Sequence, residues 1–235
     1  MSSPTCTYSI IVFGEPGVGK TCFVDQFCYG KSFVIYDPDT SVFTHEIVVN
    51  GQVSSIALMD LSTSFLKPEQ GMQPIEWAKQ MFAKAGGIVL LYDVTSLESF
   101  EFITDQAYKF LWDCRKLECA DNNEADEEER EGFGCVLVGN RLDLVTAGKG
   151  TREVSQSLAE EWARTQGISS IEVHSLERKG PEDALKLLVT DIKKLESLEK
   201  SEAKAVEVAQ EQTKGKEKRS SIRNAFKKVF NASKS

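Results

Sequence analysis

The stretch Gly14-Glu15-Pro16-Gly17-Val18-Gly19-Lys20-Thr21 fits the pattern G-x-x-x-x-G-K-[ST] of loops that cradle phosphate groups. Glycines let the backbone N–H groups of such a loop curl around phosphate oxygens without a Cβ in the way. Lys20 supplies a cation for the terminal phosphates, the Thr21 hydroxyl is a ligand for Mg²⁺, and the following helix directs its positive end at the anion. The stretch therefore predicts a nucleotide-phosphate site, whose binding residues are expected to be Gly14, Pro16, Gly17, Val18, Gly19, Lys20, Thr21 and Cys22.

The segments around this loop predict an α/β sheet. An apolar, β-rich run at Tyr8–Phe13 comes directly before the loop, and a helical pattern at Thr21–Tyr29 follows it, as the motif requires. Two further apolar runs, Ile88–Val94 and Cys135–Gly139, are unalternated, which is typical of parallel strands covered by helices on both faces. Asn50-Gly51 lies between two β-rich runs and favours a tight hairpin turn.

The remaining elements complete an alternation of strands and helices. The hairpin strands are expected at Phe43–Val49 and Gln52–Met59, a short last strand at Ser169–Val173, and helices at Ile75–Ala85, Ser99–Leu117, Ser155–Gln166 and Pro181–Glu199. This order predicts an α/β fold with a six-stranded, mostly parallel sheet, one antiparallel hairpin strand and helices on both faces.

Composition argues against several other classes of protein. The chain has 235 residues, a net charge of −8 and 41% hydrophobic residues, which suits one globular domain plus a tail. No apolar run reaches the roughly 18 residues that span a bilayer. We expect neither a signal peptide nor N-myristoylation, because the N-terminus has no basic flank and no Gly after Met1. The six cysteines are scattered without a C-x-x-C pair, so neither a disulfide framework nor a zinc site is expected.

A second motif indicates which base is bound. Asn140-Arg141-Leu142-Asp143 follows directly on an apolar strand, so it lies at the carboxyl end of the sheet, where α/β proteins bind ligands. The carboxylate of Asp143 can accept both N–H groups on the edge of guanine, a donor pair that adenine lacks. Taken alone, Asn-x-x-Asp is explained equally well as a helix cap. After a phosphate loop it predicts a guanine pocket in which Asn140, Arg141 and Asp143 bind the nucleotide.

This motif resembles the N-K-x-D box of the Ras-like small GTPases, with Arg141 in place of the usual Lys. His174-Ser175-Leu176 resembles the S-A-K element of the same family and matches it at Ser175 alone. The resemblance implies that Ser175 and Leu176 bind the nucleotide, with the backbone N–H of Leu176 donating to the guanine oxygen.

The resemblance extends from Tyr8 to about Lys194, and Tyr92-Asp93-Val94-Thr95 with Ser99-Phe100 adds to it. It implies the P-loop NTPase fold, with GTP or GDP and Mg²⁺ as cofactors. It also implies a signalling switch whose partners are effector, exchange and activating proteins. The surface from Phe33 to Val48 is expected to contact them.

The resemblance also assigns the Mg²⁺ ligands. The family ligates Mg²⁺ through a Thr in a Y-D-P-T segment, and this chain has Tyr36-Asp37-Pro38-Asp39-Thr40, with one extra Asp. Thr40 then contacts Mg²⁺ and the γ-phosphate, and Phe33 packs edge-on against the guanine. The alternative is a polar turn with a solvated Thr40. Asp60 stands where the family's D-x-x-G begins. The expected metal ligands are Thr21, Thr40 and Asp60, and the expected catalytic residues are Lys20 and Thr40.

The catalytic part of the family pattern is broken. Thr63 replaces the Gly whose N–H senses the γ-phosphate, and Ser64 stands where the family keeps a Gln that orients water. Pro16 adds bulk where an incoming arginine finger passes. We expect a GTPase with slow hydrolysis, and the alternative is a pseudo-GTPase, an interaction module that binds nucleotide without useful hydrolysis. A third class, a P-loop kinase or another adenine enzyme, is disfavoured by Asn140 and Asp143.

Charge is unevenly placed along the chain. We expect a small GTPase domain at residues 1–200, with an acidic loop insertion at 119–133 that is most simply solvated, and a basic tail at 201–235. Residues 213–235 hold eight basic residues and one acid, a net charge of +7, which leaves −15 for the rest. The tail is partly amphipathic, because apolar residues recur at helical spacing, namely Ile222, Ala225, Phe226, Val229 and Phe230.

An anionic membrane surface is the expected partner of this tail. Calmodulin-type binding and a disordered, solubilising tail are the alternatives. No nucleic acid is expected to bind, because the rest of the chain is acidic. No Cys follows Cys135, so prenylation is not expected. The expected location is the cytoplasm, at the inner face of the plasma membrane without a lipid anchor.

Overall fold

The computed structural model describes residues 7–31, 44–67, 76–120, 133–174, 176–198 and 200–201. The chain divides into two compact units, Met1–Ile192 and Lys193–Ser235. Several predictions lie outside the described residues: those for Phe33, Thr40 and Ser175, most of the acidic loop, and the basic tail after residue 201. Among the described helices, none is long and apolar enough to cross a membrane.

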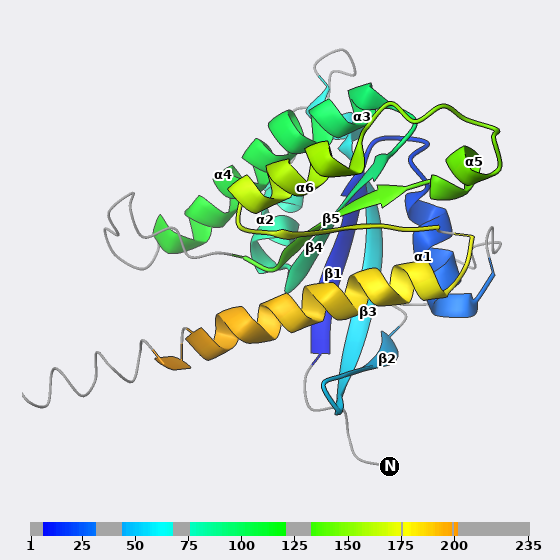
Figure 1. The fold of residues 1–235 in the computed structure, drawn as a ribbon. Helices are drawn as coiled ribbons and strands as arrows, with labels where there is room; N and C mark the ends of the chain where they lie inside the picture. The colour runs from blue at the N-terminus through cyan, green and yellow to red at the C-terminus, as the bar shows by residue number, and fades with distance from the viewer. Residues whose placement is uncertain are drawn as a thin grey trace, which may run out of the picture. The chain divides into compact units, whose positions relative to one another are not determined.

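The described strands form one sheet of six in the order β2-β3-β1-β4-β5-β6 (Figure 1). β2 and β3 are antiparallel, and every other neighbouring pair is parallel, which confirms the predicted fold class. The strand bounds are β1 Thr7–Gly14, β2 Thr44–Val49, β3 Gln52–Ser62, β4 Gly87–Asp93, β5 Cys135–Asn140 and β6 Ser169–Glu172.

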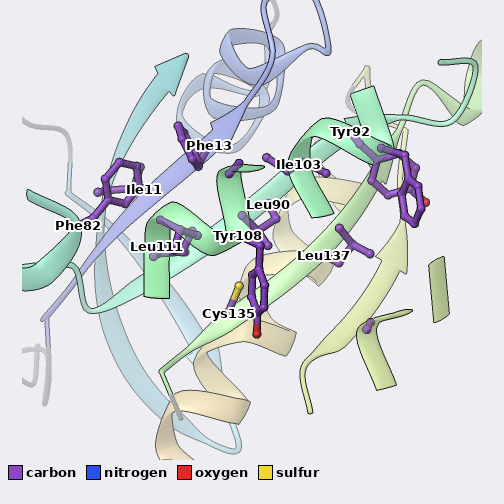
Figure 2. Close-up of a cluster of buried hydrophobic side chains, with 14 of the residues drawn as sticks. Ile11, Phe13, Phe82, Leu90, Tyr92, Ile103, Tyr108, Leu111, Cys135 and Leu137 are labelled. Atoms are coloured by element: carbon purple, nitrogen blue, oxygen red, sulfur yellow. The ribbon is translucent and has the colours of Figure 1, made fainter. Parts of the chain in front are cut away.

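Two hydrophobic clusters cover the two faces of this sheet. Successive side chains of a strand point to opposite faces, so Ile11 and Phe13 of β1 join one cluster while Ile10 and Val12 join the other. All residues of β4 and β5 are buried. Figure 2 shows the first cluster, in which Leu90 of β4 lies among residues from several helices. The unalternated apolar runs are thus explained by burial on both faces.

The helices occupy both faces as predicted. The first cluster takes residues from α2, α3, α4 and α6, and the second takes residues from α1 and from a last helix at 179–198. The bounds are α1 Lys20–Tyr29, the 3-10 helix η1 Thr63–Leu66, α2 Glu76–Lys84, α3 Leu97–Phe102, the π-helical turn η3 Ile103–Ala107, α4 Tyr108–Ala120, α5 Leu142–Thr146 and α6 Gln156–Thr165.

The helix predicted at Ser99–Leu117 is longer and less regular than expected. It begins at Leu97, because the Ser96 side chain caps it by accepting a hydrogen bond from the N–H of Ser99 at 3.2 Å. A π-helical turn then interrupts it at Ile103–Ala107. Within that turn the Thr104 hydroxyl donates to the carbonyl of Phe100 at 2.7 Å, a side-chain bond that competes with the backbone ladder.

Candidate functional site

The phosphate loop connects the end of β1 to the start of α1. At Gly14 an added Cβ would collide with the carbonyl oxygen of Leu91 on β4. Gly17 and Gly19 have φ angles of 85° and 97°, in the left-handed region that glycine adopts without strain. α1 begins at Lys20, so the N–H groups of its first turn are directed at the loop. The structure therefore gathers the predicted phosphate residues in one loop and the first turn of α1.

Lys20 is the buried cation of this loop. The residue is 9% exposed, and its Nζ donates to the carbonyl oxygen of Glu15 at 2.7 Å. Burial lowers the pKa of Lys20, while the negative charges of Asp60 and Glu15 act to raise it. A phosphate oxygen beside the ammonium group would favour the charged form and raise this pKa further. The loop therefore holds a desolvated cation that an anionic ligand would stabilise.

Two of the predicted metal ligands lie side by side. The Thr21 hydroxyl donates to Oδ2 of Asp60 at 2.7 Å, because the parallel pairing of β1 and β3 brings the loop beside Asp60. A hydroxyl and one carboxylate match the oxygen ligands of Mg²⁺, which takes its other ligands from phosphates and water. Among the described residues no cluster of three or more His, Cys, Asp or Glu forms a closed cage for another metal. These residues fit Mg²⁺, and Thr40 lies outside the described residues.

The predicted base-binding segment is bound directly to the phosphate loop. Asn140 is fully buried, and its Nδ2 donates to the carbonyl of Val18 at 2.8 Å. Arg141 has a left-handed φ of 63°, and its Nη2 donates to the carbonyl of Gly17. Its Nη1 lies 3.1 Å from Oδ2 of Asp93. Two loops far apart in the sequence are therefore joined by side-chain hydrogen bonds.

Asp143 and Leu176 lie at the same edge of the sheet as this junction. Asp143 is in the first turn of α5 and is half-buried. Leu176 follows β6 and is 54% exposed. Since β5 and β6 are parallel neighbours, the segments that follow them meet at the carboxyl edge. Arg152 fixes the end of β6, because its guanidinium donates to both carboxylate oxygens of Glu172, at 2.6 and 2.8 Å.

The segment that follows Asp60 is held against the protein. Thr63 is fully buried, and the ring of Phe65 stacks on that of Phe13 with centroids 5.9 Å apart. The N–H of Ser64 donates to Oγ of Ser62 at 3.2 Å, and the two hydroxyl oxygens are 2.7 Å apart. This is the segment in which the family resemblance leads one to expect a γ-phosphate sensor and a water-orienting side chain.

The anchoring of this segment continues at its end. Nζ of Lys67 lies 2.5 Å from Oε1 of Glu15, a buried acid of the phosphate loop, and 5.0 Å from the ring centroid of Phe102. The segment from Ser62 to Lys67, which we call the anchored segment, is therefore tied both to the core and to the phosphate loop.

A cavity of about 400 Å³ opens beside the phosphate loop. Both ion pairs described above border it, Glu15 with Lys67 and Asp93 with Arg141. The other lining residues are Pro16, Gly17, Val18, Ser96, Glu98 and Ser99.

The sequence does not predict these two ion pairs. Glu15 stands at a variable position of the loop motif, and Asp93 belongs to a segment that carries only a family likeness. The cation that each acid contacts is set by the order of strands in the sheet, which no local pattern reveals.

Comparison with known proteins places the whole site within one family match. A family model described as "Ras family" matches residues 9–194. The protein "Protein ras-1" of Neurospora crassa is 25% identical over 192 residues, which cover 81% of this chain and 78% of that protein. The family match begins in β1 and extends beyond β6, so it includes the phosphate loop, Asp60, the anchored segment and the base-binding segment.

Proposed function

The chain belongs to the Ras family of small GTPases, and on that premise we propose that it is a signalling switch that binds GTP or GDP with Mg²⁺ and hydrolyses GTP slowly. The proposal of nucleotide binding is supported by the junction of the two predicted loops, in which Nδ2 of Asn140 donates to the carbonyl oxygen of Val18 at 2.8 Å. One nucleotide carries both a base and a phosphate chain, so the two loops that bind these parts must lie at a fixed separation. The hydrogen bond supplies that fixed separation.

The roles of the residues follow from the motifs to which they belong. Lys20 and the backbone N–H groups of the loop bind the phosphates, and Asp143 selects guanine. Mg²⁺ would be held by Thr21, Asp60 and Thr40, and when bound it neutralises charge on the phosphates. Phe33, Ser175 and the backbone of Leu176 complete the guanine pocket in this proposal.

Slow hydrolysis is supported by the anchored segment. Catalysis of phosphoryl transfer depends on positioning a water molecule and stabilising charge. The Ser64 hydroxyl is short and lies 2.7 Å from that of Ser62, so it is poorly placed to orient a water. Thr63 is fully buried, so moving its backbone toward a γ-phosphate would require a buried side chain to leave its contacts.

The test is a single-turnover hydrolysis assay on the purified, GTP-loaded protein, with Neurospora crassa ras-1 measured beside it. We expect a rate at least about tenfold below that of ras-1, because the water-orienting side chain is missing, and we expect GTP among the nucleotides that co-purify. A rate equal to that of ras-1, with only GDP co-purifying, would contradict slow hydrolysis and leave an ordinary GTPase.

The second candidate is a pseudo-GTPase, an interaction module that keeps its nucleotide. The same contacts of Thr63 and Ser64 favour it. The two functions separate in the assay above, because a pseudo-GTPase would bind GTP and release no measurable phosphate in a single turnover. In either case the proposed partners are effector, exchange and activating proteins that contact the surface from Phe33 to Val48.

The basic tail is proposed to bind an anionic membrane, at the cytoplasmic face of the plasma membrane. Each basic residue near such a surface adds about 1 kcal/mol, and residues 213–235 carry a net charge of +7. Deleting residues 213–235 is expected to abolish co-sedimentation with vesicles that contain phosphatidylserine. Deleting the acidic residues 121–131 serves as the control and should leave binding intact. Undiminished sedimentation of the tail-deleted chain would exclude this role, and calcium-dependent retention on calmodulin would indicate the alternative partner.

A further inference from the structure

We propose that Asp93 is a positioning residue for Arg141, and that this ion pair slows the release of a bound guanine nucleotide. The inference rests on the proposed function, since it concerns the same nucleotide site. It adds a residue from β4 to a site that the motifs build from the phosphate loop and from the segment after β5.

Hydrogen bonds within its own turn orient the carboxylate of Asp93 toward Arg141. Asp93 ends β4, and its side chain is 9% exposed. Oδ1 accepts hydrogen bonds from the N–H and the hydroxyl of Thr95, at 2.8 and 2.6 Å. Oδ2 is left facing the guanidinium of Arg141 at 3.1 Å. The two oxygens therefore have separate partners, and the turn after β4 fixes the direction in which the acid points.

The sheet brings this acid to Arg141. β4 and β5 are parallel neighbours in which Asp93 pairs with Asn140, the residue directly before Arg141. The guanidinium thus contacts Asp93 with one nitrogen and the carbonyl of Gly17 with the other. An arginine can hold two acceptors at once because its nitrogens form a rigid, planar fork, whereas a lysine presents one compact charge on a flexible stem. The stem of Arg141 is therefore stretched between the end of β5 and the phosphate loop.

The placement of the pair favours a role in binding over a role in folding. The side chain of Arg141 is 39% exposed and borders the cavity beside the phosphate loop. Removing the pair should leave the core intact and loosen the connection between the two loops that must grip one nucleotide.

Asp93→Asn separates the two tasks of the acid. The asparagine oxygen can still accept from Thr95, while its NH₂ group, facing Arg141, is a donor against a donor. Arg141→Met removes the cation from the more exposed side of the pair, where loss of the fold is not expected. Thr95→Val is the matched control, because it removes one hydrogen bond of the turn and spares the Oδ2 contact.

The experiment measures the dissociation rate of a fluorescent GDP analogue from the full chain and from these variants, with the thermal midpoint of each. Asp93→Asn and Arg141→Met are each expected to speed release about fivefold, since truncating one partner of a charge pair acts mainly on dissociation. The double variant should release no faster than Arg141→Met alone, because the two residues act as one unit. Thr95→Val should release at the wild-type rate.

Three outcomes would overturn the inference. The first is a dissociation rate that Asp93→Asn leaves unchanged, and the second is a double variant in which the two accelerations multiply. The third is an equal acceleration by Thr95→Val, which would assign Asp93 to the turn alone. If the wild-type chain binds no GDP analogue at all, the proposed function fails together with the inference. If it binds and the variants behave like the wild type, the inference fails by itself.

Discussion

Lys20→Met is expected to weaken binding of GDP about 100-fold while leaving the fold intact. The ammonium group of Lys20 is buried, and its pKa is lowered by that burial, so it is poorly solvated and can interact strongly with a phosphate. Loss of a hydrogen bond to a charged group costs roughly 1.5–3 kcal/mol, and about 2.7 kcal/mol corresponds to a factor of 100. Methionine has a similar length and no charge, so it suits the buried position better than lysine does.

The measurement is a titration with a fluorescent GDP analogue, together with thermal midpoints with and without GDP. Without nucleotide, the midpoint of Lys20→Met should equal or exceed that of the wild type. With excess GDP the wild type should gain about 2.7 kcal/mol more stability than Lys20→Met, because the gain rises with the logarithm of the ligand concentration divided by the dissociation constant. Lys84→Met changes an exposed residue of α2 and should bind like the wild type. An unchanged affinity of Lys20→Met would remove this loop from the nucleotide site.

The parts of the fold that sequence predicts well are those governed by burial on two faces. Every residue of β4 and β5 is buried because helices cover both sides of the sheet. A continuous apolar run is therefore sufficient to predict each of these strands. The Asn50-Gly51 turn is equally local, since both residues have positive φ angles of 52° and 76° that this dipeptide tolerates. The strand alternation and the loop motif then fix the fold class.

Other features depend on contacts between distant segments. η1 has no periodic pattern of its own, and it forms where Phe65 packs between Phe13 and Phe110. The partner of Arg141 depends on β4 lying beside β5, which is a property of the sheet order. The sequence names Asn140 as a site residue, and the structure adds what its amide does, which is to hold the phosphate loop.

Phe65→Ala is expected to release the anchored segment. Phe65 is 7% exposed, and its ring contacts Phe13 and Phe110 at centroid distances of 5.9 and 5.5 Å. Replacing a buried Phe by Ala costs about 3 kcal/mol in the free energy of unfolding, because apolar contacts are lost and a cavity is left. The anchored segment should be destabilised more than the protein as a whole, since the ring is the main apolar attachment between Ser62 and Lys67.

Hydrogen exchange at the backbone N–H groups of the anchored segment measures the local effect, and denaturant unfolding measures the global one. In the wild type we expect equal protection with GDP and with a non-hydrolysable GTP analogue, because contacts to the core and to Glu15 hold the segment in either state. In Phe65→Ala the protection should fall, whereas Phe133→Ala, a change in the same hydrophobic cluster away from the site, should lower stability and leave these N–H groups protected. Wild-type protection that differs strongly between the two nucleotides would mean that the segment moves as an ordinary switch, and slow hydrolysis would then rest on Ser64 alone. Equal protection would mean that any nucleotide-dependent change which partners detect takes place elsewhere in the chain.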